Sequence, residues 1–253
     1  MTTNFAPKST AWILGAVAMG APSLGFAGII DDWQFNDGPG TQLTALANAG
    51  PSAWSGDKAN VTTDGAGSLR VTQGANVFVP TTPAMNLGTG LYEIGFTFLH
   101  ADLSGGDAAG ANAGYSVRDE SGTDLLLVRL QKIAGKIRLQ TRVDTTNTNL
   151  HLFGTDVVSD DVAVRVVADM DADTFDVFWT IGAGAEQSLT GIAMNGSGLE
   201  FDQVRMVANA NATDWGTADH VDIDFLTVSE VPEPGSLALI GLAAGLIGFR
   251  RRR

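Results

Sequence analysis

Apolar and polar residues alternate over much of the chain, which predicts β-strands that bury one face. In residues 136–143 the odd positions are Ile, Leu, Thr and Val, whereas the even positions are Lys, Arg, Gln and Arg. Residues 221–225 repeat the alternation, with Asp222 and Asp224 on the outward face. A period of two is typical of half-buried antiparallel strands. The same criterion predicts strands at 69–72, 77–79, 91–99, 115–118, 125–131, 136–143, 162–168, 175–181, 201–208 and 221–228.

Short turn sequences separate these runs. The segments 120–123, 133–135, 171–173 and 182–184 each contain Gly or Asp and each join two strand-like runs, as hairpins require. Between the two ends of the chain, no stretch has a helical period. Ten or more strands with such turns predict an all-β fold, an antiparallel two-sheet sandwich. Residues 105–114, rich in Gly, Ala and Asn, are predicted to form a long surface loop.

The N-terminal segment has the order of a secretory signal peptide. Lys8 is the only charged residue before an apolar run at 11–21, and the small-x-small sequence Gly-Phe-Ala follows. Such a segment is read by signal peptidase, and the run is shorter than the ~20 residues that a spanning helix needs. We therefore expect a signal peptide at 1–27 with cleavage between Ala27 and Gly28. The alternative is a buried N-terminal helix.

The C-terminus has three parts in a fixed order. A Val-Pro-Glu-Pro motif at 231–234 precedes an uncharged apolar run at 235–249, and four arginines end the chain at 250–253. The run would form a transmembrane helix of roughly 20 Å, short for a ~30 Å hydrocarbon core. The terminal arginines are expected to stay on the cytoplasmic side. With the signal peptide at the other end, the residues between are predicted to lie outside the inner membrane.

This tripartite end resembles the PEP-CTERM sorting signal, whose bearers are taken to be substrates of exosortase, a membrane-embedded cysteine transpeptidase-like enzyme. The resemblance implies that exosortase recognises the motif and that the helix and basic cluster are removed, leaving the protein at the cell surface or in the extracellular matrix. The implied partners are exosortase, signal peptidase and the inner membrane before processing. An ordinary C-terminal anchor is the alternative. The motif is Pro232, Glu233 and Pro234, and the basic cluster is Arg250, Arg251, Arg252 and Arg253.

Residues 28–230 remain as one predicted domain, and this body is strongly acidic. The whole chain has 15 basic and 28 acidic residues and a formal charge of −13. Without Lys8, Glu233 and the four terminal arginines, the body has ten basic and 27 acidic residues, a formal charge of −17. Phosphate backbones would be repelled, which excludes nucleic-acid binding. The absence of cysteine excludes disulfides, thiolate metal sites and a cysteine nucleophile.

Two stretches resemble the concanavalin/laminin-G-like jelly roll. Residues 32–41 resemble its opening strand and polar turn, and residues 164–178 resemble its central hairpin. The resemblance implies that the first and last strands pair, and that a structural calcium ion can lie between them. Oxygen donors suit calcium, although a solvated acidic edge that discourages aggregation is the alternative. The predicted ligands are Asp32, Asp37, Asp222 and Asp224, with Asp31, Asn36 and Asp219 as further donors.

Other motifs give weaker predictions. Asp169, Asp171 and Asp173 are spaced as in an EF-hand, but the sixth and twelfth positions are threonine, so an acidic hairpin turn is expected. His100, His151 and His220 are far apart in sequence and lack metal-ligand spacing, so each is expected at the surface or at a strand end. Trp54 and Trp215 lie in polar, loop-like contexts and are the candidates for stacking on sugars, whereas Trp33 and Trp179 are expected in the core.

No set of residues predicts catalysis. Glycoside hydrolases of this fold carry carboxylates at alternate positions of one strand. The pairs Asp222/Asp224 and Glu200/Asp202 have that spacing but lack a third acid or an aromatic platform. The sequence therefore predicts a non-enzymatic, surface-sorted protein associated with the extracellular polysaccharide of a biofilm matrix. A carbohydrate-binding module and a polysaccharide-active enzyme are the alternatives.

Overall fold

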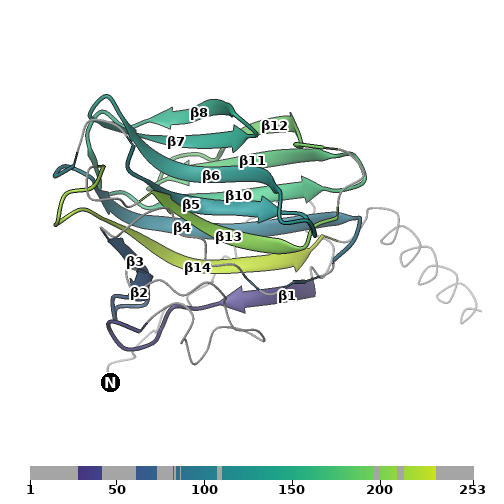
Figure 1. Ribbon diagram of the computed structural model, residues 1–253, viewed down its shortest axis with the longest axis horizontal. Coiled ribbons are helices and arrows are strands. Elements are labelled where there is room, and N and C mark those ends of the chain that lie inside the picture. Colours follow the sequence, from purple (N-terminus) through teal and green to yellow (C-terminus); the bar gives the residue numbers. More distant parts are fainter. Residues whose placement is uncertain are drawn as a thin grey trace, which may run out of the picture.

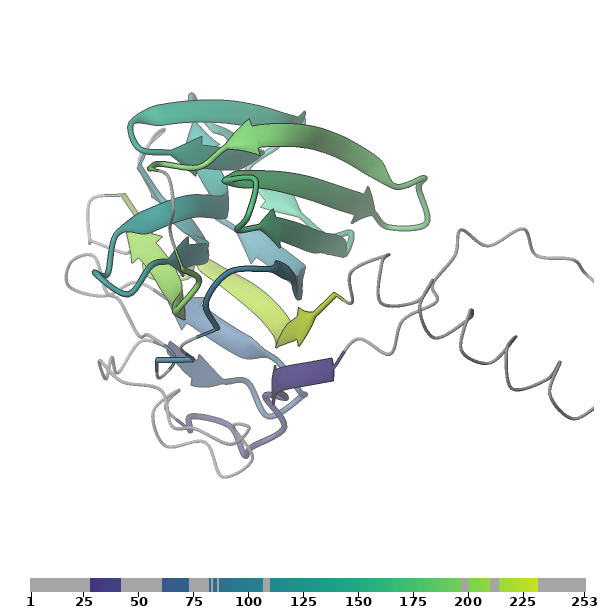
Figure 2. The ribbon, with the colours of Figure 1, turned by 90° about the vertical axis from the view of Figure 1, so that its right-hand side faces the viewer.

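The computed structural model describes residues 28–41, 61–72, 82, 84–85, 87–106, 110–196, 200–209 and 214–231. Within these ranges every regular element is a β-strand, and no helix is long and apolar enough to cross a membrane. The strands form two antiparallel layers, as predicted (Figures 1 and 2). The predicted signal peptide at 1–27, the Pro-Glu-Pro motif, the C-terminal helix and the arginine cluster lie outside the described residues. Gly28, the expected first residue after cleavage, is the first residue that the structure describes.

The larger layer, sheet A, has nine strands. Its main order is β12-β11-β10-β4-β14-β3-β2, with β1 paired to β14 and β9 paired to β4. Trp33 of β1 lies opposite Leu226 of β14, so the first and last strands do pair. The strands are β1 (Gly28–Trp33), β2 (Val61–Thr63), β3 (Leu69–Thr72), β4 (Leu91–Asp102), β9 (Val157–Val158), β10 (Val162–Asp169), β11 (Thr174–Ile181), β12 (Gln187–Ala193) and β14 (His220–Glu230).

The smaller layer, sheet B, has five strands in the order β13-β5-β6-β7-β8. Its hairpins have tight turns: Ala134 and Gly135, between β6 and β7, both have positive φ, of 51° and 72°. This conformation is typical of two-residue turns that match strand twist, and it sets Ile133 opposite Lys136. The strands are β5 (Asn112–Arg118), β6 (Asp124–Ile133), β7 (Lys136–Val143), β8 (Thr146–Leu152) and β13 (Gln203–Asn209).

The core lies between the two sheets. Phe96 of β4 meets Tyr115 of β5 edge-to-face, with ring centroids 4.9 Å apart. Trp33 and Trp179 are both buried, as predicted. Each large apolar side chain removed from water contributes about 1.5–3 kcal/mol, so these inner faces hold the layers together. The other large buried side chains include Phe35, Phe98, Phe175, Phe201 and Trp215.

Most predicted strands are confirmed within a few residues, and the discrepancies have physical causes. Four strands were not predicted: β2 and β9 are only three and two residues long, and β8 and β12 are edge strands with mostly exposed polar residues and no apolar alternation. The opening strand expected within 32–41 lies earlier, as β1. Residues 112–114 were predicted to belong to a loop, but they begin β5 and are buried. The acidic turn at 170–173 joins β10 to β11 as expected. The predicted strand at 77–79 lies outside the described residues.

Candidate ligand-binding groove

The outward face of sheet B carries an ordered set of polar residues. Because Tyr115 points into the core, the even-numbered residues of β5 point away from it. Antiparallel pairing extends this face across the sheet, since Gly114 lies opposite Arg129 and Arg129 lies opposite Gln140. The resulting cross-strand rows are Asn112–Gln131–Arg138, Val207–Gly114–Arg129–Gln140–Asn149 and Arg205–Ser116–Leu127–Arg142–Asn147.

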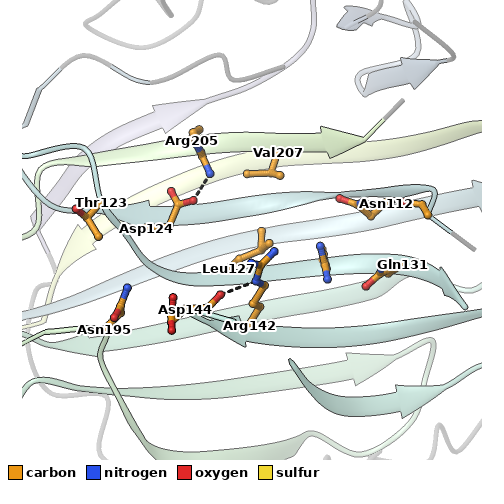
Figure 3. Close-up of a pocket in the computed structure, with 12 residues that line it drawn as sticks. Asn112, Thr123, Asp124, Leu127, Gln131, Arg142, Asp144, Asn195, Arg205 and Val207 are labelled. Atoms are coloured by element: carbon orange, nitrogen blue, oxygen red, sulfur yellow. Dashed lines mark hydrogen bonds and ion pairs between the residues drawn. The ribbon is translucent and has the colours of Figure 1, made fainter. Parts of the chain in front are cut away.

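A hollow of about 580 Å³ lies over these rows, a size within the range of small-ligand sites. Figure 3 shows Arg205 and Arg142 on opposite sides of it, with Leu127 between them. Asn195, from the segment after β12, lies near one end. We call this hollow the groove. Its lining is Gly110, Asn112, Thr123, Asp124, Leu127, Arg129, Gln131, Arg142, Asp144, Asn195, Arg205 and Val207.

Arg129 is a buried cation in the groove. The residue is 6% exposed, and its Nη2 donates to Oδ1 of Asn147 at 3.0 Å. Its Nε has no hydrogen-bond partner, and no carboxylate of the described residues forms an ion pair with it. Burial, with a smaller contribution from Arg142, lowers the pKa of Arg129 to about 10. A desolvated charge without a counterion is unfavourable, so an anionic group here would be stabilised.

The other groove arginines are only partly neutralised. Asp124 is shared between Arg205 and Arg118, with Nε of Arg118 at 3.3 Å. Arg142 donates through Nε to the backbone carbonyl oxygen of Asp144 at 2.6 Å. The lining has three arginines, Arg129, Arg142 and Arg205, against two carboxylates, Asp124 and Asp144, which leaves a positive charge. The groove can therefore accept further negative charge.

Amide groups add neutral hydrogen-bonding capacity. Gln140 donates through Nε2 to Oδ1 of Asn149 at 2.6 Å, but its Oε1 has no partner among the described residues. Oε1 of Gln131 is also buried without a described partner. Buried polar atoms are normally satisfied, so each oxygen can take a further donor, and of the two residues Gln131 is the one that lines the groove. Guanidinium donors beside amide acceptors suit a ligand with both carboxylate and hydroxyl groups.

The predicted calcium ligands do not converge. Asp32 lies opposite Thr227 on β14, five residues from Asp222, and accepts a hydrogen bond from Gln34. Five residues of strand span roughly 17 Å. Asp222, predicted to face solvent, is 6% exposed and binds Arg70. In the part of the chain that the structure describes, no three of Asp32, Asp37, Asp222 and Asp224 form a metal-sized cluster, so they do not build one calcium cage.

Of the two predicted sugar-stacking residues, the structure describes Trp215, which does not line the groove. Trp215 is 1% exposed, so the prediction of an accessible platform was wrong. Its polar sequence neighbours gave no sign of burial, because the loop folds inward: the carboxylate of Asp219 accepts backbone hydrogen bonds from Gly105, Gly106 and Gly216. Trp54 lies outside the described residues.

The hydrolase pairs do not enter the groove either. Asp222 is bound to Arg70 on sheet A, and neither Glu200 nor Asp202 lines the groove. The arginines that do line it were missed, because in sequence each is an ordinary outward position of an alternating strand. The structure also brings His100 and His220 together. The repeated pattern His-x-Asp at 100–102 and 220–222 could have indicated this.

Comparisons with known proteins agree with both the terminal signal and the fold. Residues 230–253 match the PEP-CTERM protein-sorting motif. This motif implies an exported protein that has a membrane-anchored intermediate before processing by an exosortase. No curated protein matches the sequence.

Solved structures similar to this fold include lectins, a lectin-like protein and an alginate lyase. Arcelin-5, a lectin-like defence protein from Phaseolus vulgaris, is 12% identical with a TM-score of 0.52, over 80% of this chain and 98% of its own. Lectin UEA-II complexed with galactose is 12% identical with a TM-score of 0.50, over 78% and 97%. Alginate lyase Aly36B is 11% identical with a TM-score of 0.53, over 79% and 97%. The body of this chain therefore has the legume-lectin-like β-sandwich fold.

Proposed function

We propose that this exported protein binds an acidic polysaccharide in the groove of sheet B, without chemical turnover, and thereby associates with the extracellular matrix. The observation that carries the proposal is the convergence of Arg129, Arg142 and Arg205 on one hollow. These arginines lie in a chain whose formal charge is −13. A cationic groove on an acidic protein is a local feature that the overall composition does not explain.

The chemistry of the lining favours carboxylated sugars. A guanidinium group presents donors in a planar fork that matches a carboxylate, and uronic acids supply one carboxylate per residue. The amides of Asn112, Gln131 and Asn195 are suited to the sugar hydroxyls. Charges more than about 8 Å away are largely screened at physiological salt. The acidic residues elsewhere therefore do not prevent a polyanion from entering the groove.

Binding without turnover is supported by the lining itself. Among the groove residues that the structure describes there is no histidine, tyrosine or cysteine to transfer a proton or attack the sugar. The carboxylates of the lining are Asp124, which is held in ion pairs with Arg118 and Arg205, and Asp144. Lectin UEA-II is described in complex with galactose, and Aly36B is described as an alginate lyase. A polysaccharide-active enzyme remains the second candidate on the basis of the latter name alone.

The test compares two forms of one polymer. Polygalacturonate oligomers and their methyl-esterified counterparts share a backbone but differ in charge, so calorimetric titration of the full chain isolates the carboxylate contribution. We expect the acid form to bind at least about tenfold more tightly. Arg142→Gln should remove most of that difference, whereas Arg165→Gln, on sheet A, should preserve it. Equal affinity for both forms, or no binding of either, would overturn the proposal. Appearance of shortened or unsaturated oligomers would instead support the enzyme.

A further inference from the structure

Two histidines meet on sheet A, far from the groove in the strand order. In Figure 1, β4 and β14 run side by side, and their register places His100 opposite Asp222 and His220 opposite Asp102. Nδ1 of His100 lies 3.1 Å from Nε2 of His220. The two rings stack with centroids 5.0 Å apart and an interplanar angle of 24°. Two ring nitrogens therefore point at one small space.

The tautomer of His220 is set by its second ring nitrogen. Nδ1 of His220 lies 3.0 Å from the carbonyl oxygen of Ala218. A carbonyl oxygen can only accept a hydrogen bond, so Nδ1 carries the proton and the neutral ring presents a lone pair at Nε2. A ring N–H donated to a backbone carbonyl is the usual support of a metal-binding histidine. Nε2 of His220 therefore accepts a hydrogen bond from Nδ1 of His100, and His100 can ligate an ion through Nδ1 once that proton moves to its own Nε2.

A carboxylate completes a three-ligand set. Oδ2 of Asp222 lies 3.8 Å from Nε2 of His220, and the ligand atoms of His100, His220 and Asp222 all lie within 4.8 Å of one another. A tetrahedral zinc ion with bonds of about 2.0–2.1 Å separates its ligands by roughly 3.4 Å. The 3.1 and 3.8 Å separations lie on either side of that value. Small side-chain movements would therefore bring the three atoms to three corners of such a tetrahedron.

We propose that His100, His220 and Asp222 bind a divalent transition-metal ion, with Zn²⁺ as the fitting ion. Imidazole nitrogens favour zinc, copper and nickel, whereas calcium and magnesium favour all-oxygen sites. The side chain of His220 is 20% exposed, which leaves a path for the ion and a fourth position for water. The site joins β4 to β14 and is independent of the groove proposed for polysaccharide.

The surrounding charges are compatible with a bound cation. Arg70 holds Asp222 through two hydrogen bonds, of 2.7 and 2.6 Å, and so fixes the orientation of the carboxylate. Asp102 is the cross-strand partner of His220. Asp102 therefore adds a second carboxylate next to the histidine pair, which is compatible with a bound cation.

The experiment is a calorimetric titration of Zn²⁺ into the untagged full chain, because a polyhistidine tag would itself bind the ion. We expect one equivalent of Zn²⁺, and we expect excess Ca²⁺ not to displace it. Co²⁺ should give the visible absorption of a tetrahedral nitrogen–oxygen site. If the titration shows no binding of one equivalent of Zn²⁺, the proposal is overturned. This result uses the unmodified chain and does not depend on whether a variant folds.

Variants assign the ligands. His100→Asn and His220→Asn should each weaken Zn²⁺ binding at least about tenfold, by analogy with the effect of losing supporting groups at metal sites. The matched control is His151→Asn, because His151 contacts Phe153 on sheet B and lies outside the cluster. This control should bind Zn²⁺ as the unmodified chain does. Equal weakening in all three variants, or in none, would refute this set of ligands.

Discussion

The two sheets of the sandwich have similar inner faces and opposite outer faces. Both inner faces are apolar, and Phe96 of sheet A packs on Tyr115 of sheet B. The strands of sheet B carry seven basic residues and one acidic residue, Asp124. The strands of sheet A carry two basic and nine acidic residues. Charge is therefore sorted by layer, although the chain as a whole is acidic.

This difference separates stability from recognition. The inner faces of both sheets stabilise the fold by burying apolar area. The outer faces are free to differ, because their side chains make few contacts across the core. On sheet B this freedom produces a cationic groove, and on sheet A it produces surface ion pairs and the His-His-Asp cluster. A substitution on the outer face of one sheet should therefore leave the ligand site on the other sheet unchanged.

The largest expected effect is on stability alone. Trp215→Ala should lower the free energy of unfolding by about 4 kcal/mol, because it removes a fully buried indole. The folded fraction should bind acidic oligosaccharide as before, since Trp215 does not line the groove. Urea unfolding followed by circular dichroism measures the first effect, and titration below the transition measures the second. Weakened binding at unchanged stability would restore Trp215 as a sugar-stacking residue.

A charge reversal on each sheet tests the groove directly. Arg142→Glu should weaken binding of a polyuronate by about 2–3 kcal/mol, roughly 30- to 150-fold, because an attraction becomes a repulsion. Arg165→Glu makes the same change of charge on sheet A, where Arg165 pairs with Glu93 and Glu186. That variant should bind within about twofold of the unmodified chain. If both variants lose affinity equally, net charge rather than the groove governs binding.

A smaller effect concerns pH at the edge of sheet A. Burial, with a smaller contribution from Asp32, raises the pKa of Asp31 to about 6. The folded state then holds the proton more tightly than the unfolded state, so the contribution of Asp31 to stability is fully present below about pH 4 and is lost as the pH rises through 6. Asp31→Asn should remove this fall and stabilise the protein by about 1 kcal/mol at pH 7.5, allowing for solvent near the strand.

Thermal melts between pH 4 and pH 8 measure this effect. Asp160→Asn, which removes an exposed carboxylate, is the control and should retain the pH dependence of the unmodified chain. An unchanged profile for Asp31→Asn would show that Asp31 is not responsible for it.

The smallest effect belongs to the ion pairs of sheet A. Arg165 is about 3.4 Å from Glu93 and 3.3 Å from Glu186, and its guanidinium lies 3.8 Å from the centre of the Phe178 ring. Such partly exposed contacts contribute little. Arg165→Gln should therefore cost about 0.5 kcal/mol, measured by urea unfolding. A decrease in the free energy of unfolding above roughly 2 kcal/mol would mean that the outer face of sheet A contributes to stability as the inner faces do.

The fold was more predictable than the site, for reasons visible in particular residues. Ile137 and Leu139 are apolar at alternate positions, and burial of one strand face imposes that alternation wherever it occurs. Edge strands such as β8 do not show this alternation because few of their side chains are buried. The burial of Trp215 could not be predicted in this way either, because a loop that folds inward has no alternating pattern in its sequence. The acids predicted to share a calcium ion are separated along β14 by a distance that only strand register defines.

The sequence by itself determined the terminal sorting signal and the all-β sandwich, because both depend on local order: a short motif at one end, and a period of two between. Only the tertiary structure decided which outward residues become neighbours. Arg129, Arg142 and Arg205 come from three strands, and His100 and His220 are separated by 120 residues. Strand order and register bring them together, and neither is encoded in the spacing of any one segment.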